Sequence, residues 1–373
     1  MFREIEVQLK DRLSEIVFIE LAKDIKFNNS DFVLKKDIPL PLKMDKIVNQ
    51  VKTEKVSDDF DVKGMIEGIV YLLGVDSEFV HKDYYVDILK NINPTIVNDI
   101  VKSGIYKASN NRIIEGMIDL KAALIIDDIS LDALYNYSRI LENLALKETD
   151  EEKVNMYLKE AYESLKKIQV NYPDNYISYF HLGFHYANEG FNQKAKETWD
   201  RALSMNIPDD IRDEILKNLL KIENKVRFEK GRTFILEGRI QEGLELLHSL
   251  ETEESDWVDL NFYLGLAYRY EGTFDRALNY FNKCDKLSQN NDNILNEIGI
   301  CSMMIGDYEK AKNVLERSLQ IKKDNPEILC NLGLVYYQLQ EDEKAEKLLK
   351  AAYKLDPEDE IVVSWIQKLG IEV

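Results

Sequence analysis

Apolar and polar positions follow the period of amphipathic helices along most of this chain, and from residue 176 onward the pattern recurs in blocks. In the block from 326, Leu332 and Tyr336 fall on one predicted helix, and Ala345 and Leu349 fall on a second. Pro357 follows the second helix and is expected to end it, because proline cannot continue a helix. Each block therefore predicts an antiparallel pair of helices.

Glycines give the period of the blocks. Four of them are spaced by 34 residues: Gly231, Gly265, Gly299 and Gly333. A second series follows the first three by seven residues: Gly238, Gly272 and Gly306. Small residues let two helix backbones approach to about 8–10 Å, and a helix pair with apolar faces on both sides is stable only when stacked. The pattern predicts an all-α solenoid with a concave surface.

Two steps between blocks are longer than the period. Blocks in this phase start near 131, 176, 224, 258, 292 and 326. The 48-residue step from 176 to 224 holds 14 inserted residues, which form either an added helix or a long extension of the next unit. The block from 131 holds 11 extra residues around Lys147 to Met156.

The two ends of the chain depart from the repeat. Residues 63–130 keep weaker marks of the phase and are predicted as degenerate helical hairpins, while residues 1–62 are predicted as a helical N-terminal cap with helices near 3–26 and 43–54. Residues 360–373 are predicted as a C-terminal capping helix. That helix is apolar on more than one face, so a homodimer through Trp365 stays open beside simple burial against the preceding unit.

The blocks resemble the tetratricopeptide repeat family, including its bacterial type. The matching residues are Leu332-Gly333, Tyr336, Ala345, Leu349, Ala352 and Pro357 in one block, Leu264-Gly265, Tyr268, Gly272, Phe274, Ala277 and Phe281 in another, and Leu182-Gly183, Tyr186, Gly190, Ala195, Trp199 and Ala202 in a third. The resemblance implies a right-handed α-solenoid of helix-turn-helix repeats over 131–359. It also implies a concave groove that binds a protein or a peptide.

The repeat phase predicts which residues line that groove, because the first helix of each pair faces inward. Aromatic residues with interspersed Arg and Asn suit an extended peptide or an amphipathic helix. The alternative is that the rings pack against neighbouring helices. Phe180, Phe228 and Phe262 share one repeat position and are expected to form a ladder. The predicted groove residues are Phe180, His181, Phe184, Asn188, Phe228, Arg232, Phe262, Tyr263, Leu266, Arg269, Tyr270, Asn296, Met303, Asn331 and Tyr337.

Charge and composition narrow the expected partners. The formal net charge is −19, and no clustered Lys and Arg stripe stands out, so nucleic-acid binding is disfavoured. No apolar stretch approaches the ~18 residues of a membrane span. Three cysteines form no CxxC pair and are expected to be small apolar fillers in a reducing compartment. These features favour a cytoplasmic protein that binds neither nucleic acid nor membrane.

Catalytic and metal chemistry have little support in the sequence. Of the four histidines, His181 and His185 have the i,i+4 spacing that can hold zinc, but no third ligand accompanies them. No Gly-rich phosphate loop, GxSxG or HExxH motif occurs. We therefore expect no enzyme activity, no cofactor and no metal.

Two functions are compatible with these observations. The first is a protein- or peptide-binding scaffold or adaptor. The second is a cytosolic regulator that responds to a peptide, as some bacterial solenoids of this length do, with residues 1–62 acting on a response protein.

Overall fold

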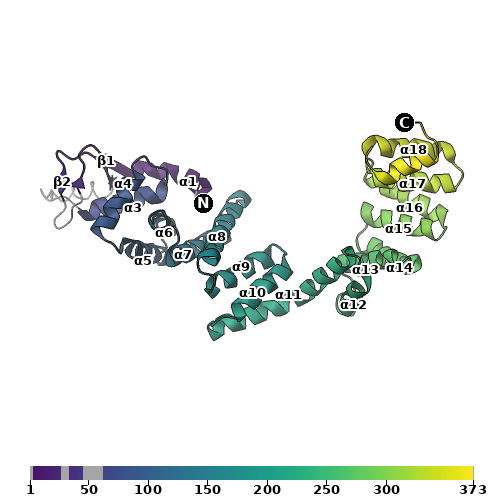
Figure 1. Ribbon diagram of the computed structural model, residues 1–373, viewed down its shortest axis with the longest axis horizontal. Coiled ribbons are helices and arrows are strands. Elements are labelled where there is room, and N and C mark those ends of the chain that lie inside the picture. The colour runs from purple at the N-terminus through teal and green to yellow at the C-terminus, as the bar shows by residue number, and fades with distance from the viewer. Residues whose placement is uncertain (1–2, 27–32, 45–61, 373) are drawn as a thin grey trace. The chain divides into compact units, whose positions relative to one another are not determined.

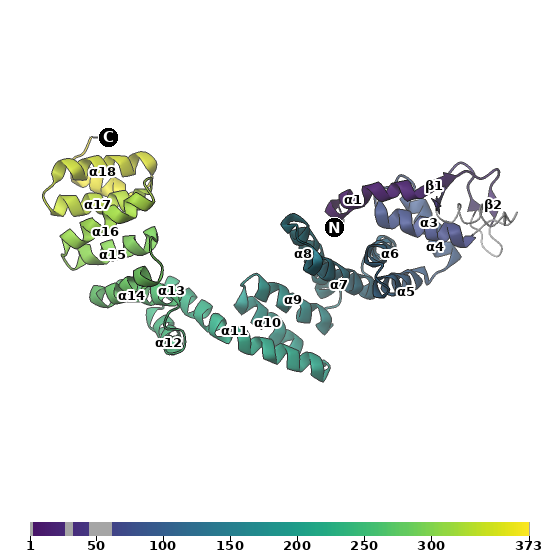
Figure 2. The same cartoon turned by 180° about the vertical axis from the view of Figure 1, so that it is seen from behind.

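The computed structural model describes residues 3–26, 33–44 and 62–372. The chain divides into two compact units, Met1–Asn218 (unit 1) and Leu219–Val373 (unit 2). The division falls within the long helix α11 (Asp209–Leu236). Each unit consists mainly of helices that pair as antiparallel hairpins (Figures 1 and 2). The predicted all-α repeat fold is confirmed.

Unit 1 begins with a short helix and four short strands. The helix α1 spans Arg3–Leu9, and a 3-10 turn, η1, follows over Lys10–Glu15. Strand β1 (Ile16–Ile19) pairs antiparallel with β4 (Leu40–Lys43), and β2 (Ile25–Lys26) pairs with β3 (Val33–Leu34). The predicted helix over 3–26 is therefore wrong after residue 15, because the β-branched and aromatic run Ile16–Ile19 suits a strand. The helix predicted near 43–54 falls outside the described residues after Met44.

The N-terminal helix is fixed to unit 1 by buried polar contacts. Lys121 is fully buried, and its ammonium group pairs with Glu6 and donates to the carbonyl oxygen of Gly74 at 3.0 Å. The hydroxyl of Tyr71 donates to Glu15 at 2.7 Å. A buried lysine without a partner would strongly destabilise the fold, so these contacts hold residues 3–15 in place.

The remaining helices of unit 1 follow in chain order. They are α3 (Val62–Val75), α4 (Lys82–Ile92), α5 (Ile96–Ser109), α6 (Ile113–Ile126), α7 (Leu131–Lys147), α8 (Glu151–Asn171), α9 (Tyr176–Asn188) and α10 (Asn192–Leu203). The 11 extra residues expected in the block from 131 lengthen α7 to 17 residues and α8 to 21 residues. The insertion in the next block lengthens α11 to 28 residues, so it is an extension and not a separate helix.

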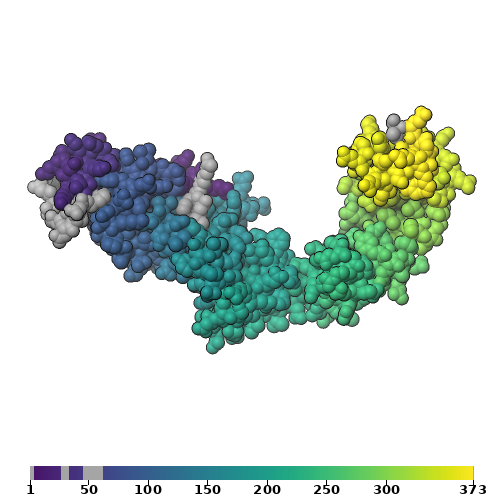
Figure 3. All heavy atoms as spheres, viewed as in Figure 1, coloured from purple at the N-terminus to yellow at the C-terminus, as the bar shows by residue number. Residues whose placement is uncertain are grey.

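The helices of unit 2 repeat with nearly constant lengths. After α11 they are α12 (Ile240–Glu251), α13 (Val258–Tyr270), α14 (Phe274–Leu287), α15 (Asp292–Met304), α16 (Tyr308–Ile321), α17 (Pro326–Gln338), α18 (Asp342–Leu355) and α19 (Glu360–Lys368). The hairpins from α13 to α18 stack into one continuous body in the space-filling view (Figure 3). Asn291, Asn325 and Asp359, which are 34 residues apart, accept backbone N–H groups at the starts of α15, α17 and α19.

The two glycine series have different structural roles. Gly265 lies where α13 crosses α14, and a Cβ atom there would come within 2.7 Å of the Phe281 ring. Gly272 and Gly306 end first helices with positive φ angles of 74° and 83°, which glycine adopts without strain. In the last repeat the same place holds Gln340, which keeps a positive φ of 64°.

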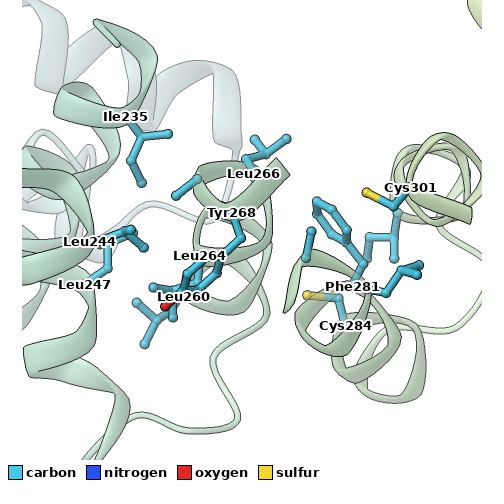
Figure 4. Packing of buried hydrophobic residues seen from close by; sticks show 14 of the residues in the cluster. Ile235, Leu244, Leu247, Leu260, Leu264, Leu266, Tyr268, Phe281, Cys284 and Cys301 are labelled. Carbon is cyan, nitrogen blue, oxygen red and sulfur yellow. The ribbon is translucent and has the colours of Figure 1, made fainter. Parts of the chain in front are cut away.

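The core of unit 2 lies between the hairpins. Leu244, Leu264, Phe281 and Cys301 belong to one buried cluster that joins successive helix pairs (Figure 4). Cys284, Cys301 and Cys330 are all buried and unpaired, which confirms their expected place as apolar fillers. At the C-terminal end, α19 buries Val362 and Ile366 against the last hairpin and leaves Ile361 63% exposed.

Candidate functional site

A cleft of about 770 Å³ lies beside α7 and α9, the first helices of two consecutive hairpins in unit 1. Side chains from α7, the first half of α8, α9 and the start of α11 line it. They are Arg139, Glu142, Asn143, Ala145, Leu146, Val154, Leu158, Phe180, His181, Phe184, His185, Asn188, Glu189 and Glu214. Its volume is in the range of sites that hold a small ligand or a few peptide side chains.

Residues in and next to the insertion of the first hairpin add apolar side chains to the lining of this cleft. Leu146 lies in the last turn of the lengthened α7 and is 86% exposed. Leu158 lies in the lengthened α8 and is 37% exposed, with Val154 one turn before it. Large apolar side chains gathered at an exposed concave site are typical of a surface that binds a partner.

The opposite wall is polar and joins the two hairpins. His185 Nε2 lies 2.9 Å from Glu142 Oε1, and Glu142 also pairs with Arg139. His181 Nδ1 lies 3.3 Å from Nη1 of Arg139. Because His181 and His185 are one turn apart on α9, both reach α7. The two histidines therefore position Arg139 and Glu142 across the helix interface.

Burial sets the charge of these groups. Burial lowers the pKa of His181 to about 4, so its ring is neutral at neutral pH. Burial raises the pKa of Glu142, but the hydrogen bond with His185 and the charges of Arg139 and His181 outweigh that effect and hold the pKa below its ordinary value. With Glu142, Glu189 and Glu214 against one arginine, the cleft is acidic.

All four residues predicted from the block at 176 line this cleft. Asn188 is exposed and Phe184 is half-buried, whereas Phe180 and His181 are buried at its base. The Phe180 and Phe184 rings meet edge to face with their centres 5.2 Å apart, and Phe184 contacts Trp199 at 5.1 Å. Phe184 therefore offers its ring to the cleft, while Phe180 supports it from below.

The predicted aromatic residues of unit 2 are largely engaged with one another. Phe228 is buried, with its ring centre 4.4 Å from that of Trp257 and 5.9 Å from that of Tyr263. Phe262 contacts Tyr263 at 5.7 Å and Phe281 of its own hairpin at 5.6 Å. Tyr263 thus contacts both phenylalanines. Phe180 and Phe228 are buried and Phe262 is half-buried. The expected ladder of the three rings stays a prediction.

Polar residues predicted for the groove of unit 2 also pair within the chain. Arg269 forms an ion pair with Glu297 at 2.9 Å and lies over the ring of Tyr270, which is 50% exposed. The guanidinium of Arg232 lies 5.9 Å from the Tyr263 ring centre. Leu266 is buried in the core.

The last two repeats continue this polar chain. Asn331 donates to Asn296 at 3.0 Å, and Asn296 donates to Glu327 at 2.9 Å. Met303 packs between two apolar clusters, and the Tyr337 ring lies 6.4 Å from that of Trp365. Whether any of these residues contacts a partner stays a prediction.

Sequence reasoning missed the residues of α7 and α8 that line the cleft. Arg139, Glu142, Leu146 and Leu158 lie in the block from 131, whose repeat pattern is weak because of the insertion. One signal in the sequence could have found them. α7, like α9, is the first helix of its hairpin, so its inward repeat positions correspond to those of α9. The insertion itself marks where the regular surface changes.

No helix of the described ranges is long and apolar enough to cross a membrane. The same ranges contain no group of three or more His, Cys, Asp or Glu side chains that could hold a metal ion.

Family models match three stretches of the C-terminal half. A tetratricopeptide repeat is matched at residues 258–291 and again at 326–359, and a TPR repeat at 305–340. The matches at 258–291 and 326–359 coincide with the hairpins α13/α14 and α17/α18, and the match at 305–340 covers α16 and α17. No curated protein matches the chain.

Several solved structures are similar to parts of the chain. YrrB, described as a TPR protein with an unusual peptide-binding site, is 16% identical with a TM-score of 0.39, over 55% of this chain and 99% of that one. MamA from Desulfovibrio magneticus RS-1 is 25% identical with a TM-score of 0.37, over 39% and 81%. The Arabidopsis OM64 TPR domain is 16% identical with a TM-score of 0.30, over 30% and 93%. The family matches at 258–291, 305–340 and 326–359, together with the stacked hairpins, show that this chain contains tetratricopeptide repeats.

Proposed function

We propose that the protein is a non-catalytic interaction scaffold or adaptor whose cleft beside α7 and α9 binds a segment of a partner protein. The observation that carries the proposal is the exposure of Leu146 and Leu158 beside an acidic wall, in a recess that the repeat array forms between its first helices. The bound segment inserts apolar side chains against the two leucines and Phe184. Burial of such side chains supplies most of the binding free energy.

The charge of the cleft defines the rest of the segment. Glu142, Glu189 and Glu214 favour a Lys or Arg side chain on the partner, and Asn188 offers an amide to its backbone. We therefore infer that the preferred segment is amphipathic, with apolar residues and at least one basic residue. The overall charge of −19 speeds the approach of such a segment.

A selection from a displayed random peptide library tests this proposal. The wild-type chain is expected to enrich peptides with apolar and basic residues, and Leu146→Asp/Leu158→Asp is expected to bind the enriched peptide at least about tenfold more weakly. Val170→Asp is the matched control, because Val170 is 75% exposed on the same helix as Leu158 and lies outside the cleft. Absence of any enriched peptide, or equal binding by the double variant, would contradict the proposal.

Other parts of the prediction also stay proposals. Tyr263, Tyr270 and Tyr337 of unit 2 are partly exposed and offer a second contact surface. A homodimer through α19 would use Ile361 and Trp365, and sedimentation of a Trp365→Lys variant at unchanged mass would remove it. We propose a cytoplasmic location from the unpaired cysteines and the lack of a long apolar stretch in the sequence.

The alternative of a peptide-responsive regulator needs residues 1–62 to act on another protein. Glu6 pairs with Lys121 of α6, and Glu4 pairs with Lys159 of α8 at 2.9 Å. Deletion of residues 1–62 would therefore expose a buried lysine and lower the stability of unit 1. Point substitutions on exposed positions of the N-terminal segment are the better test of that role.

A further inference from the structure

A second cavity of unit 1, of about 760 Å³, lies among α3, α5, α6 and the end of β4. It is separate in its lining residues from the cleft beside α7 and α9. Nothing in the proposed scaffold function uses it. Its two sides differ in chemistry, and that difference indicates the kind of molecule that fits.

One part of the cavity lining is aliphatic. It consists of Ile66 and Val70 of α3 and Ile96 and Ile100 of α5. Val70, Ile96 and Ile100 are otherwise buried, while Ile66 is half-buried. These branched aliphatic groups suit a flexible alkyl chain, and the one aromatic ring of the lining, Tyr71, lies under Lys43.

The other side carries basic groups. Lys107 Nζ lies 2.5 Å from Asp119 Oδ2, and Asp119 also accepts from Ser103 at 2.7 Å. Arg112 pairs with Glu115. The hydrogen bond from Arg112 holds the pKa of Glu115 below its ordinary value despite burial, and Lys43 and Lys107 add to the effect.

Lys43 differs from these two cations. Its ammonium group lies 4.1 Å from the centre of the Tyr71 ring, and no described carboxylate lies within 4.0 Å of it. The hydroxyl of Tyr71 is held by Glu15, so the ring is fixed beneath the lysine. Glu67 and Asp99 also line the cavity, and Asp99 is exposed at its edge. Lys63 also lines the cavity and is exposed, and no carboxylate of the described residues pairs with it either. Of these two lysines, Lys43 is the one that lies over the Tyr71 ring, so we assign it as the cation that receives an anion from outside the chain.

We propose that this cavity binds a small anionic amphiphile, with its head group at Lys43 and its aliphatic tail between Ile66 and Ile100. The head group is a carboxylate or a phosphate monoester, since a lysine binds either as a point charge. The volume lies in the range of small-ligand sites. Such a molecule requires a cation beside an apolar recess, and Lys43 offers one that no carboxylate of the described residues neutralises by an ion pair.

Isothermal titration calorimetry of the full chain tests the proposal with four probes below their micelle concentrations. Octanoate and octyl phosphate carry both head and tail, octanol lacks the charge, and acetate lacks the tail. We expect at least one of the two amphiphiles to bind at least about tenfold more tightly than octanol and acetate. Whichever binds more tightly identifies the head group. Equal binding of octanol and both amphiphiles would overturn the proposal.

Variants locate the bound molecule. Lys43→Gln and Ile66→Asn are each expected to weaken binding at least about fivefold. Lys102→Gln is the matched control, because Lys102 is exposed on α5 and does not line the cavity. Unchanged affinity in Lys43→Gln would overturn the proposal. If Lys43→Gln does not fold, the salt dependence of the wild-type chain is the test. An affinity for the amphiphile that added salt does not weaken would overturn the proposal. The peptide selection on the other cleft is independent of these results.

Discussion

The hairpins around α7 and α9 in unit 1 and those from α13 to α18 in unit 2 follow the same repeat plan but treat their inner surface differently. From α13 to α18 the paired helices are 13 and 14 residues long, and inward side chains pair with each other, as Arg269 does with Glu297 and Asn331 with Asn296. In unit 1 the lengthened α7 and α8 leave Leu146 and Leu158 exposed over a recess. In the regular repeats the inner side chains pair with one another, whereas beside the insertion apolar side chains stay exposed at a cleft.

This difference also explains why the most recognisable repeats are not where the candidate site lies. The 34-residue spacing is conserved in α13 to α18 because each hairpin must fit the one before it. Family models match that part of the chain. An insertion breaks the spacing and lengthens two helices, which weakens the pattern and forms the wall of the cleft.

The largest expected effect concerns the close helix contact beneath the cleft. A Cβ atom at Gly183 would lie 2.2 Å from Trp199 Nε1, whose N–H donates to the carbonyl oxygen of Phe180 at 3.0 Å. The ring cannot move without losing that bond, so Gly183→Ala is expected to lower the free energy of unfolding by about 3 kcal/mol. Urea unfolding followed by tryptophan fluorescence measures it.

Unit 2 supplies the control for this substitution. A Cβ atom at Gly333 would meet only the flexible Leu349 side chain, at 3.0 Å, and more distant atoms. Because alanine also favours helix, Gly333→Ala is expected to stay within about 1 kcal/mol of the wild type. An equal decrease in the free energy of unfolding for Gly183→Ala and Gly333→Ala would contradict the proposed difference in packing between the two regions.

A second prediction concerns pH. The pKa of His181 is about 4 in the folded chain, below its ordinary 6.5, so the unfolded chain takes up this proton first as the pH falls. The stability of unit 1 should therefore fall between about pH 6.5 and pH 4, by on the order of 3 kcal/mol, and should be independent of this group above that range. The lowered pKa of Glu142 acts in the same direction at more acidic pH.

Trp199 reports this pH effect when the other two tryptophans, Trp257 and Trp365, are replaced by Phe. In that background His181→Gln is expected to flatten the pH dependence between about pH 6.5 and pH 5. The same slope with and without the histidine would show that another group is responsible.

The smallest of the three effects is in unit 2. Arg269→Met leaves the carboxyl of Glu297, whose side chain is 12% exposed, without its counter-charge. Burial already raises the pKa of Glu297 and Arg269 opposes that rise, so we expect the variant to lose about 1–2 kcal/mol. Hydrogen exchange of α13 and α15 is the measurement. Arg269→Met/Glu297→Leu should recover most of the loss, and a double variant as unstable as the single one would show that the pair does not matter.

Much of the fold could be predicted because the same close contact between paired helices recurs in each repeat. Glycines at 231, 265, 299 and 333 marked the crossings of paired helices, and the phase located the first helices. The strands near the N-terminus could not be predicted, since β1 pairs with β4 across the segment that holds β2 and β3, and only the pairing distinguishes a short apolar strand from a helix turn.

The candidate site was predicted in part. His181, Phe184 and Asn188 were found because α9 keeps the repeat phase, whereas Glu142 and Leu146 were missed because the block of α7 does not. The burial of Phe228 could not be foreseen, because the ring that covers it, Trp257, comes from the turn before α13, outside the repeat pattern. The repeat phase predicts the direction in which a side chain points, and the neighbouring side chains decide how exposed that side chain is.

The contacts of α1 with α8 also set the order in which unit 1 can be completed. Glu4 pairs with Lys159, and Gln8 accepts from the hydroxyl of Tyr157 at 3.3 Å. At about 5–20 residues per second, the ribosome reaches these partners roughly 7–30 seconds after it has made α1. The contacts between α1 and α8 therefore cannot form during synthesis until residues 157–159 have emerged.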